Sequence, residues 1–192
     1  MLLVVCAAAA QPTVSTAETS YIGKLLVASP DMPDLRFAEA VIYICRHDDN
    51  GTFGLVLNRP TGSMPLANLM DSLKLDGSRD AHGSIEVRRG GPVDTGNVYV
   101  LHSDDFASKG AICQDGGAAV SSSPDVVQAL AGGRGPARAV LLLGYAGWEP
   151  DQLEGEIAQG GWDVVAADAK FLFDTRPEDM WRRARERRSL DL

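Results

Sequence analysis

The dipeptide Asn50-Gly51 separates two apolar segments, 40–45 and 52–57, and this arrangement constrains the fold more than any other feature of the sequence. Both segments have the length and composition of β-strands. Asparagine and glycine accept the positive φ angles of a tight reversal, so the two strands should form an antiparallel hairpin. The first strand is almost continuously apolar, which predicts burial on both faces. A hairpin at this position excludes a purely parallel, doubly wound sheet.

The rest of the chain predicts strands and helices that alternate only in part. Strands are expected at 24–29, 85–88, 98–102, 139–143 and 162–166, and helices at 66–73, 125–131, 151–157 and from 177 onward. Ser63 and Ser123 are expected to cap the first two helices, and residues 104–117 to form a loop. The combination favours an α+β domain with a mixed sheet.

The length of 192 residues and the hydrophobic content of 45% are those of one globular domain. We expect residues 20–192 to form this domain. We predict that residues 1–19 are a disordered extension or a doubtful start, because their apolar stretch is short and lacks the basic residue of a secretory signal. The formal net charge is −8, whereas a protein that grips nucleic acid needs a basic surface. Direct DNA binding is therefore not expected.

Three cysteines, Cys6, Cys45 and Cys113, form an odd and sparse set without a C-x-x-C pair. This usage argues against a disulfide framework and for a reducing compartment, so we expect a cytoplasmic protein. No segment reaches the ~18 apolar residues that a membrane-spanning helix needs. We therefore expect no membrane association.

Motifs for phosphate binding and for nucleophilic catalysis are missing from the sequence. It contains neither G-x-x-x-x-G-K-[ST] nor G-x-S-x-G. Cys45 and His47 alternate on one strand, and Asp48, Asp49 or His102 could complete a tetrahedral metal site. Zinc sites usually show recurring ligand pairs, and here there is one pair. We therefore expect neither a metal nor a cofactor.

Cys45 is the candidate redox residue. A reactive thiolate needs an accessible, electropositive setting, and Arg46 and His47 follow Cys45 directly. Its apolar strand favours the opposite interpretation, a buried and inert thiol. Cys113 lies in a glycine-rich segment beside Asp115, without a neighbouring cation in the sequence. Both interpretations stay open.

Glycine, polar and aromatic residues gather where strands are expected to end, and loops held by a rigid scaffold often carry binding residues. The candidate ligand-binding residues are Asn58, Arg59, Gly90, Gly91, His102, Tyr145 and Trp148. Arg59 would contact an anionic group, the glycines would offer backbone N–H donors, and Trp148 would form an apolar wall. The alternative is that these glycines make tight turns and the aromatic rings fill the core.

The same segments resemble the signature blocks of the AlgH/YqgE family. The matching blocks are FGLVLNRP at 53–60, GGPV at 90–93, VLH at 100–102 and LGYAGW at 143–148, with CRH at 45–47, QLE at 152–154 and LFD at 172–174. The resemblance runs from about Tyr21 to Arg185. It implies an α+β fold with a mixed, bifurcated β-sheet partly closed into a small barrel, with surrounding helices. Members are uncharacterised, cytosolic bacterial proteins, some labelled transcriptional regulators, and the family supplies no catalytic residue set.

The sequence has glycine, polar and aromatic residues at its expected strand ends and no catalytic motif. This combination predicts a non-enzymatic regulatory or binding protein that acts through a small ligand or a protein partner. One alternative is an enzyme that uses His47 or His102 as acid–base, with Cys45, because imidazole titrates near neutrality. A second alternative is a thiol redox sensor. A protein partner that itself binds DNA would be compatible with the regulator label.

Overall fold

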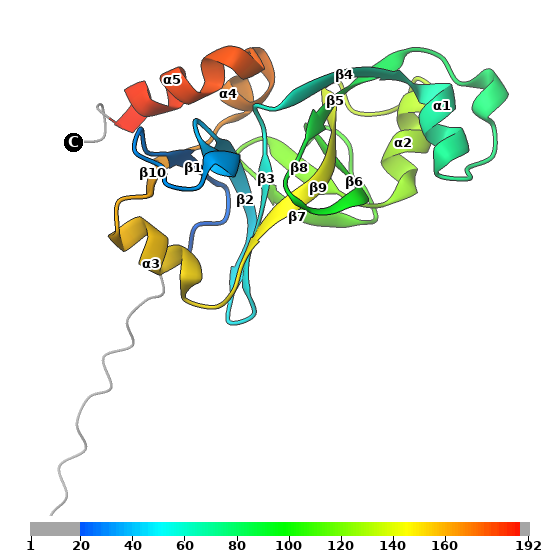
Figure 1. Cartoon of the computed structure of the whole chain (residues 1–192). Helices are drawn as coiled ribbons and strands as arrows, with labels where there is room; N and C mark the ends of the chain where they lie inside the picture. Colours follow the sequence, from blue (N-terminus) through cyan, green and yellow to red (C-terminus); the bar gives the residue numbers. More distant parts are fainter. Residues whose placement is uncertain (1–19, 189–192) are drawn as a thin grey trace, which may run out of the picture.

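A branched sheet with helices at both ends forms the framework of the computed structural model, which describes residues 20–188 (Figure 1). Its strands are β1 (Lys24–Ala28), β2 (Val41–Asp48), β3 (Gly51–Val56), β4 (Pro60–Pro65), β5 (Ser84–Arg89), β6 (Val93–Ser103), β7 (Ala111–Asp115), β8 (Ala118–Ser121), β9 (Ala139–Trp148) and β10 (Trp162–Ala166). Its helices are α1 (Leu66–Ser72), α2 (Pro124–Ala131), α3 (Gln152–Ala158), α4 (Ala169–Asp174) and α5 (Pro177–Arg188), with 3-10 turns η1 (Leu35–Phe37) and η2 (Ser78–Asp80). The mixed α+β class is confirmed.

The hairpin of β2 and β3 is the element that the sequence predicted most directly, and it is confirmed. Asp48 faces Gly51 across the turn, and the positive φ of 105° falls on Gly51 alone. A Cβ atom at Gly51 would lie 2.2 Å from the carbonyl oxygen of Trp148, so no other residue fits there. Residues 41–45 are buried throughout and contribute to clusters on both faces of the sheet, as the apolar run predicted.

The sheet divides at β9. Residues 139–143 of β9 lie between β5, which runs parallel, and β6, which runs antiparallel. Beyond Gly144, which has a φ of 70°, residues 146–148 pair with β3 instead. The hydrogen-bonded order is β10-β1-β2-β3-β9-β6-β8-β7, with β5 and β4 branching from β9. The bifurcated sheet implied by the family resemblance is thus present.

The barrel in that expectation needs correction, because the described strands do not form a closed ring. β10 and β7 are the two ends of the hydrogen-bonded path. The sheet curls far enough to bring β7 beside β2, where the hydroxyl of Tyr43 donates a hydrogen bond to the carbonyl oxygen of Asp115 over 3.3 Å. We call this contact between β2 and β7 the seam. Side chains, not a backbone ladder, join the two strands there.

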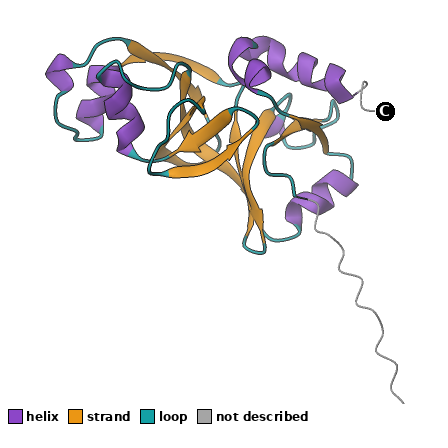
Figure 2. Cartoon of the chain, turned by 180° about the vertical axis from the view of Figure 1, so that it is seen from behind, coloured by secondary structure: helices purple, strands orange, loops and turns teal. Residues whose placement is uncertain are grey.

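Helices cover the sheet in three places, each over its own apolar cluster (Figure 2). One cluster joins the sheet to α4 and α5, and includes Tyr43, Leu101 and Phe171. A second lies beneath α3 and η1, and includes Trp148 and Trp162. The third joins α1 and α2 to β5 and β9 at the opposite end. In the described part of the chain, no helix is long and apolar enough to cross a membrane.

Two local predictions were wrong, and two short elements were not predicted. Residues 111–115 form β7 inside the expected loop, where four of the five residues are exposed and give no apolar pattern. Residues 60–65 form β4, so Ser63 lies in a strand and α1 begins after Pro65 without a side-chain cap. The helix α4 and the buried strand β8 were not predicted. Ser123 does cap α2, its hydroxyl accepting from the backbone N–H of Asp125 at 3.4 Å.

The expectation that the cysteines form no disulfide was also wrong. Cys45 of β2 is bonded to Cys113 of β7, with the two Cα atoms 5.2 Å apart across the seam. The odd count misled because two of the three cysteines pair with each other, which an odd total does not prevent. Cys6 lies outside the described residues. The two partners are 68 residues apart in the sequence, and their proximity depends on how the sheet curls. Spacing alone does not encode this arrangement.

Candidate functional site

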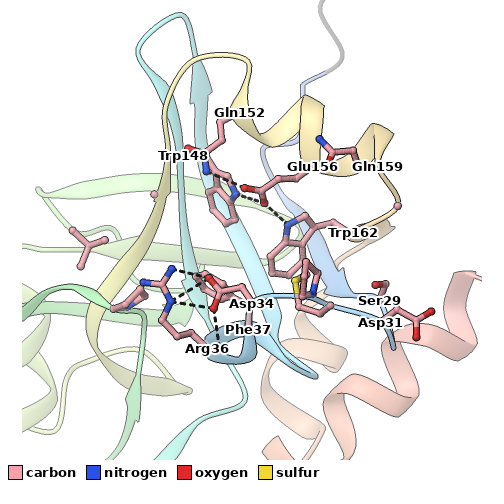
Figure 3. Close-up of a pocket in the computed structure, with 17 residues that line it drawn as sticks. Ser29, Asp31, Asp34, Arg36, Phe37, Trp148, Gln152, Glu156, Gln159 and Trp162 are labelled. Atoms are coloured by element: carbon pink, nitrogen blue, oxygen red, sulfur yellow. Dashed lines mark hydrogen bonds and ion pairs between the residues drawn. The ribbon is translucent and has the colours of Figure 1, made fainter.

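A cavity of about 610 Å³ opens between η1, α3, the end of β9 and the start of β10 (Figure 3). We call it the Glu156 cavity. Its lining residues are Ser29, Asp31, Met32, Pro33, Asp34, Arg36, Phe37, Pro92, Val93, Gly147, Trp148, Gln152, Glu156, Gln159, Gly160, Gly161 and Trp162. A volume of this size lies within the range of small-molecule sites.

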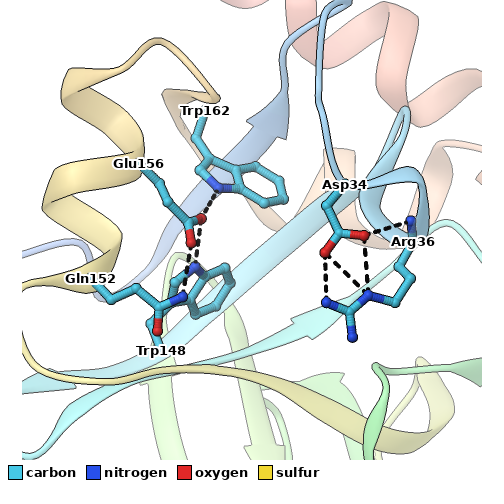
Figure 4. Close-up of polar contacts among 6 residues, drawn as sticks. All are labelled: Asp34, Arg36, Trp148, Gln152, Glu156 and Trp162. Carbon is cyan, nitrogen blue, oxygen red and sulfur yellow. Dashed lines mark hydrogen bonds and ion pairs between the residues drawn. The ribbon is translucent and has the colours of Figure 1, made fainter.

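The carboxylate of Glu156 organises one wall of the cavity. Its Oε2 atom accepts hydrogen bonds from the indole N–H of Trp148 at 2.9 Å and from that of Trp162 at 2.7 Å. Its Oε1 atom accepts from the side-chain amide of Gln152 at 2.9 Å. Figure 4 shows all three donors directed at the one carboxylate. The three contacts fix the position of a negatively charged group beside two large rings.

The sequence around α3 explains how these groups meet. Gln152 and Glu156 are four residues apart and therefore lie on one face of α3. The helix ends at Ala158, Gly160 beyond it has a φ of 76°, and the N–H of Gly161 bonds back to the carbonyl oxygen of Glu156 at 2.9 Å. This sharp ending sends the chain directly into β10, whose first residue, Trp162, returns toward Glu156 (Figure 4).

Three aromatic rings form the apolar part of the cavity. The ring centroids of Trp148 and Trp162 lie 6.0 Å apart in an edge-to-face arrangement. The ring of Phe37 lies 6.5 Å from Trp148 and 5.7 Å from Trp162. These distances are those of interacting aromatic pairs. The cluster thus brings η1, β9 and β10 together around the carboxylate.

A carboxylate–guanidinium pair lies opposite, on η1 (Figure 4). Asp34 caps η1 by accepting from the backbone N–H of Arg36 at 3.0 Å, and its carboxylate is 2.7 Å from the Arg36 guanidinium. The hydrogen bonds from the Arg36 side chain lower the pKa of Asp34 below its ordinary value of 3.8. Both groups keep their charges at neutral pH.

The cavity as a whole is acidic. The ionisable residues of its lining are the three acids Asp31, Asp34 and Glu156 and the one base Arg36, which gives −3 + 1 = −2. Since Asp34 holds Arg36 in a mutual pair, Asp31 and Glu156 carry the net negative charge. Chemically, the arrangement suits a ligand with positive charge and an apolar surface.

Four of the sequence-predicted residues hold the scaffold together. Asn58 is buried, its amide oxygen accepting from the N–H of Val41 at 3.0 Å and its amide nitrogen donating to the carbonyl of Glu39 at 2.8 Å. Arg59 donates to the carbonyl oxygen of Ala38. Gly90 pairs its N–H with the carbonyl of Leu143 at 2.7 Å.

Gly91 is required because of its neighbour. A Cβ atom there would lie 2.0 Å from the backbone of Tyr145. The paired glycines at 90 and 91 therefore allow a close approach of the chain to β9. Gly90 and Gly91 thus both lie in tight backbone contacts with β9.

The histidines occupy separate environments. His102 is 0% exposed, with Nδ1 2.8 Å from the carbonyl oxygen of Ser103 and Nε2 2.9 Å from the hydroxyl of Ser121. His47 lies 2.9 Å from the hydroxyl of Thr52 and 3.3 Å from the carboxylate of Glu154. Neither lines the Glu156 cavity. Among the residues that the structure describes, no group of three or more metal-ligating side chains is present.

Tyr145 and Trp148, three residues apart on β9, face two different cavities. Trp148 lines the Glu156 cavity, and Tyr145 lines a second cavity of about 650 Å³, which we call the seam cavity. Its lining residues are Arg46, Phe53, Leu73, Asp94, Gly96, Asn97, Val98, Tyr99, Ile112, Ser122 and Tyr145. The structure therefore does not bring the seven candidate residues to one surface, and their role in ligand binding stays a prediction.

Sequence reasoning missed Glu156, Trp162 and the η1 pair. The available signal was the short segment between the two tryptophans, which holds a helix with Gln and Glu four residues apart and a Gly-Gly ending. That pattern predicts a return of the chain toward the helix. It does not identify η1, which precedes Trp148 by more than a hundred residues, as the opposite wall.

Comparison with known proteins identifies the family. A family model described as AlgH-like matches residues 25–192. A UPF0301 protein of Nitrobacter hamburgensis is 42% identical, covering 91% of this chain and 84% of its own. A UPF0301 protein of Methylococcus capsulatus is also 42% identical, with 92% and 94% covered.

Solved structures show the same fold. The solution structure of the AlgH protein from Pseudomonas aeruginosa matches with a TM-score of 0.72 and 37% identity, covering 94% of this chain and 92% of that one. A crystal structure of a Corynebacterium diphtheriae protein matches with a TM-score of 0.66 at 21% identity, over 85% and 84% of the two chains, and supports the fold alone. The chain belongs to the AlgH-like family.

Proposed function

We propose that this protein is a non-enzymatic binding protein and that a small organic cation occupies the Glu156 cavity. One observation carries the proposal: a carboxylate, held by two indole N–H groups and an amide, lies beside three aromatic rings in a cavity of about 610 Å³. Fixed polar groups in an apolar cavity are the usual design of a small-molecule site.

Charge and ring chemistry favour a cation over other ligands. Aromatic faces carry negative electrostatic potential, and rings grouped with a carboxylate are the common means of binding quaternary ammonium groups. The lining has a formal charge of −2, and its one cation, Arg36, is engaged by Asp34. An anionic ligand would meet two carboxylates without a free counter-charge.

Binding is favoured over catalysis by the composition of the lining. Among the described residues that line the cavity, none is a histidine, a cysteine or a lysine. The carboxylate of Glu156 is committed to three donors, which suits a fixed charge better than a group that exchanges protons with a substrate. An enzyme based on His47 or His102 with Cys45 would operate elsewhere in the molecule.

A regulatory role belongs to the same proposal, whereas the cytoplasmic location expected from the cysteine usage loses that support because Cys45 and Cys113 are bonded. The exposed Leu35, 85% accessible on η1, offers a protein partner an apolar contact next to the cavity lining. Such a partner could sense whether the cavity is filled. Direct contact with DNA is not part of the proposal, because the net charge is −8.

Isothermal titration with two matched probes tests the proposal. Choline carries a quaternary ammonium group, and 3,3-dimethylbutan-1-ol is its neutral analogue of similar shape. We expect choline to bind at least about tenfold more tightly than the alcohol, and Glu156→Gln to remove this preference. Glu149→Gln is the matched control, because that exposed residue does not line the cavity. Equal binding of both probes, or no binding of choline, would refute the cation site.

A further inference from the structure

The disulfide between Cys45 and Cys113 is the covalent link across the seam. β2 pairs with β1 and β3, and β7 pairs with β8, so the described strands share no backbone ladder there. The other polar link that crosses directly from β2 to β7 is the hydrogen bond from Tyr43 to Asp115. Much of the closure between these strands therefore depends on the oxidation state of one cysteine pair.

Irregularities in both strands accompany the two cysteines. The register of β2 against β3 shifts between Ile44 and Arg46, which makes Cys45 the extra residue of a β-bulge. The register of β7 against β8 shifts between Ala111 and Cys113. A bulge bends its strand and redirects a side chain, and such features recur next to functional sites. Here both bulges lie at the disulfide.

The same bulges form part of the seam cavity. Arg46 follows Cys45 and Ile112 precedes Cys113, and both line the cavity of about 650 Å³. Phe53 and Tyr145, with ring centroids 5.0 Å apart, line it as well. The Cys45–Cys113 disulfide joins the residues next to Arg46 and Ile112, and so limits how far these two lining residues can separate.

We propose that the Cys45–Cys113 disulfide is a reversible modification site for small thiols and that its reduction opens the seam cavity. The two sulfurs differ in access, since Cys45 is 3% exposed and Cys113 is only partly buried. An incoming thiolate therefore attacks Sγ of Cys113, where thiol–disulfide exchange has the easier approach.

The exchange balances in two steps. The thiolate bonds to Sγ of Cys113, the disulfide breaks, and its electron pair leaves on Sγ of Cys45, which takes a proton from solvent. A second thiol attacks the sulfur of the bound reductant and releases Cys113 as a thiol. Two small thiols are thereby oxidised to one small disulfide, and the cysteine pair gains two electrons and two protons. Reaction with an oxidised small disulfide reverses both steps.

Hydrogen exchange measured by mass spectrometry tests this inference on the full chain carrying Cys6→Ser, so that one cysteine pair remains. Samples are compared as oxidised, after reduction with dithiothreitol, and after reoxidation with oxidised glutathione. We expect amides of β7 and β8 to exchange about tenfold faster after reduction and to regain protection on reoxidation. β4 and β5, which pair with each other on the branch of the sheet that holds neither cysteine, are the internal control.

The double variant Cys45→Ser/Cys113→Ser should show the fast exchange in all three conditions. Equal exchange of the oxidised and reduced protein would overturn the opening of the seam. If dithiothreitol reduces the pair only in urea, the bond is a static structural link and the exchange site is refuted. Alkylation of both cysteines after treatment with oxidised glutathione would show that the bond does not form, and would also refute it.

Discussion

Trp148 and Trp162 donate their indole N–H groups to the same atom, Oε2 of Glu156, at 2.9 and 2.7 Å. One residue ends β9 and the other begins β10, and α3 lies between them. A single carboxylate thus ties both strand ends to the helix that connects them. The contacts of this carboxylate hold the aromatic wall of the cavity in place.

Glu156→Gln should lower the free energy of unfolding by about 1–3 kcal/mol, because a neutral amide replaces a charged acceptor that serves three donors. The NH2 group of the new glutamine would also face one of those donors without accepting a hydrogen bond from it. Urea denaturation followed by circular dichroism measures the change. Glu149→Gln, with the same loss of charge on an exposed side chain, should stay within about 0.5 kcal/mol of the unmodified protein. Similar values for the two variants would contradict this role.

The pair of Asp34 and Arg36 predicts a pH dependence. Since the hydrogen bonds from Arg36 lower the pKa of Asp34, the contribution of the pair to stability is present above the ordinary value of 3.8 and is lost as pH falls through the lowered value. Carboxyl ¹³C resonances followed through an acid titration should give a pKa below 3.8 for Asp34. In Arg36→Gln this pKa should rise toward 3.8. An unchanged pKa in that variant would mean that Arg36 is not the cause.

Tyr43 predicts a second pH effect, at the alkaline end. Burial raises the pKa of Tyr43 to about 12, with a smaller contribution from the charge of Asp115. The pKa of Tyr43 in the folded protein exceeds the ordinary value of 10.0. The protonated Tyr43 hydroxyl therefore contributes fully to stability below pH 10, and this contribution is lost as pH rises toward 12. The difference between the two pKa values corresponds to about 3 kcal/mol of folding free energy.

Near-ultraviolet absorbance records this titration directly. The chain has four tyrosines, and the unmodified protein should show one late component near pH 12 that Tyr43→Phe lacks. Tyr99→Phe is the control, because burial also raises the pKa of Tyr99, and this variant should keep the component near pH 12. Its presence in Tyr43→Phe would assign it to another tyrosine.

The seam disulfide should contribute to equilibrium stability. It closes a sequence separation of 68 residues, and disulfides typically stabilise a protein by about 2–4 kcal/mol. Guanidinium unfolding of the oxidised protein and of Cys45→Ser/Cys113→Ser should differ by that amount. The single variant Cys6→Ser should match the unmodified protein. No difference between the oxidised protein and the double variant would mean that the bond adds nothing to the fold.

Much of the framework could be predicted from the sequence because its signals are local. The apolar run at 40–45 and the turn at Asn50-Gly51 specify a buried hairpin, and Ser123 with Pro124 specifies the start of α2. β7 gave no such signal, since it is short and exposed and its pairing depends on β8. Local patterning therefore revealed most of the core strands but missed β4, β7 and the short, buried β8.

The candidate site was less accessible to such reasoning. Trp148 was recognised as a binding candidate, but its partners come from α3, β10 and η1. The approach of η1 to Trp148 depends on the packing of Phe37 against both tryptophans, which no short-range pattern encodes. The disulfide has the same origin, because curvature of the whole sheet brings Cys45 to Cys113.

The most direct test of the Glu156 cavity is a choline titration followed through the indole N–H resonances. The chain has three tryptophans, and Trp181 donates to the carbonyl oxygen of Ala28 at 2.8 Å without lining the cavity. We predict that the resonances of Trp148 and Trp162 shift together with a common saturation curve, while that of Trp181 stays in place. Equal shifts of all three, or no shift of Trp148 and Trp162, would contradict a cation site at Glu156.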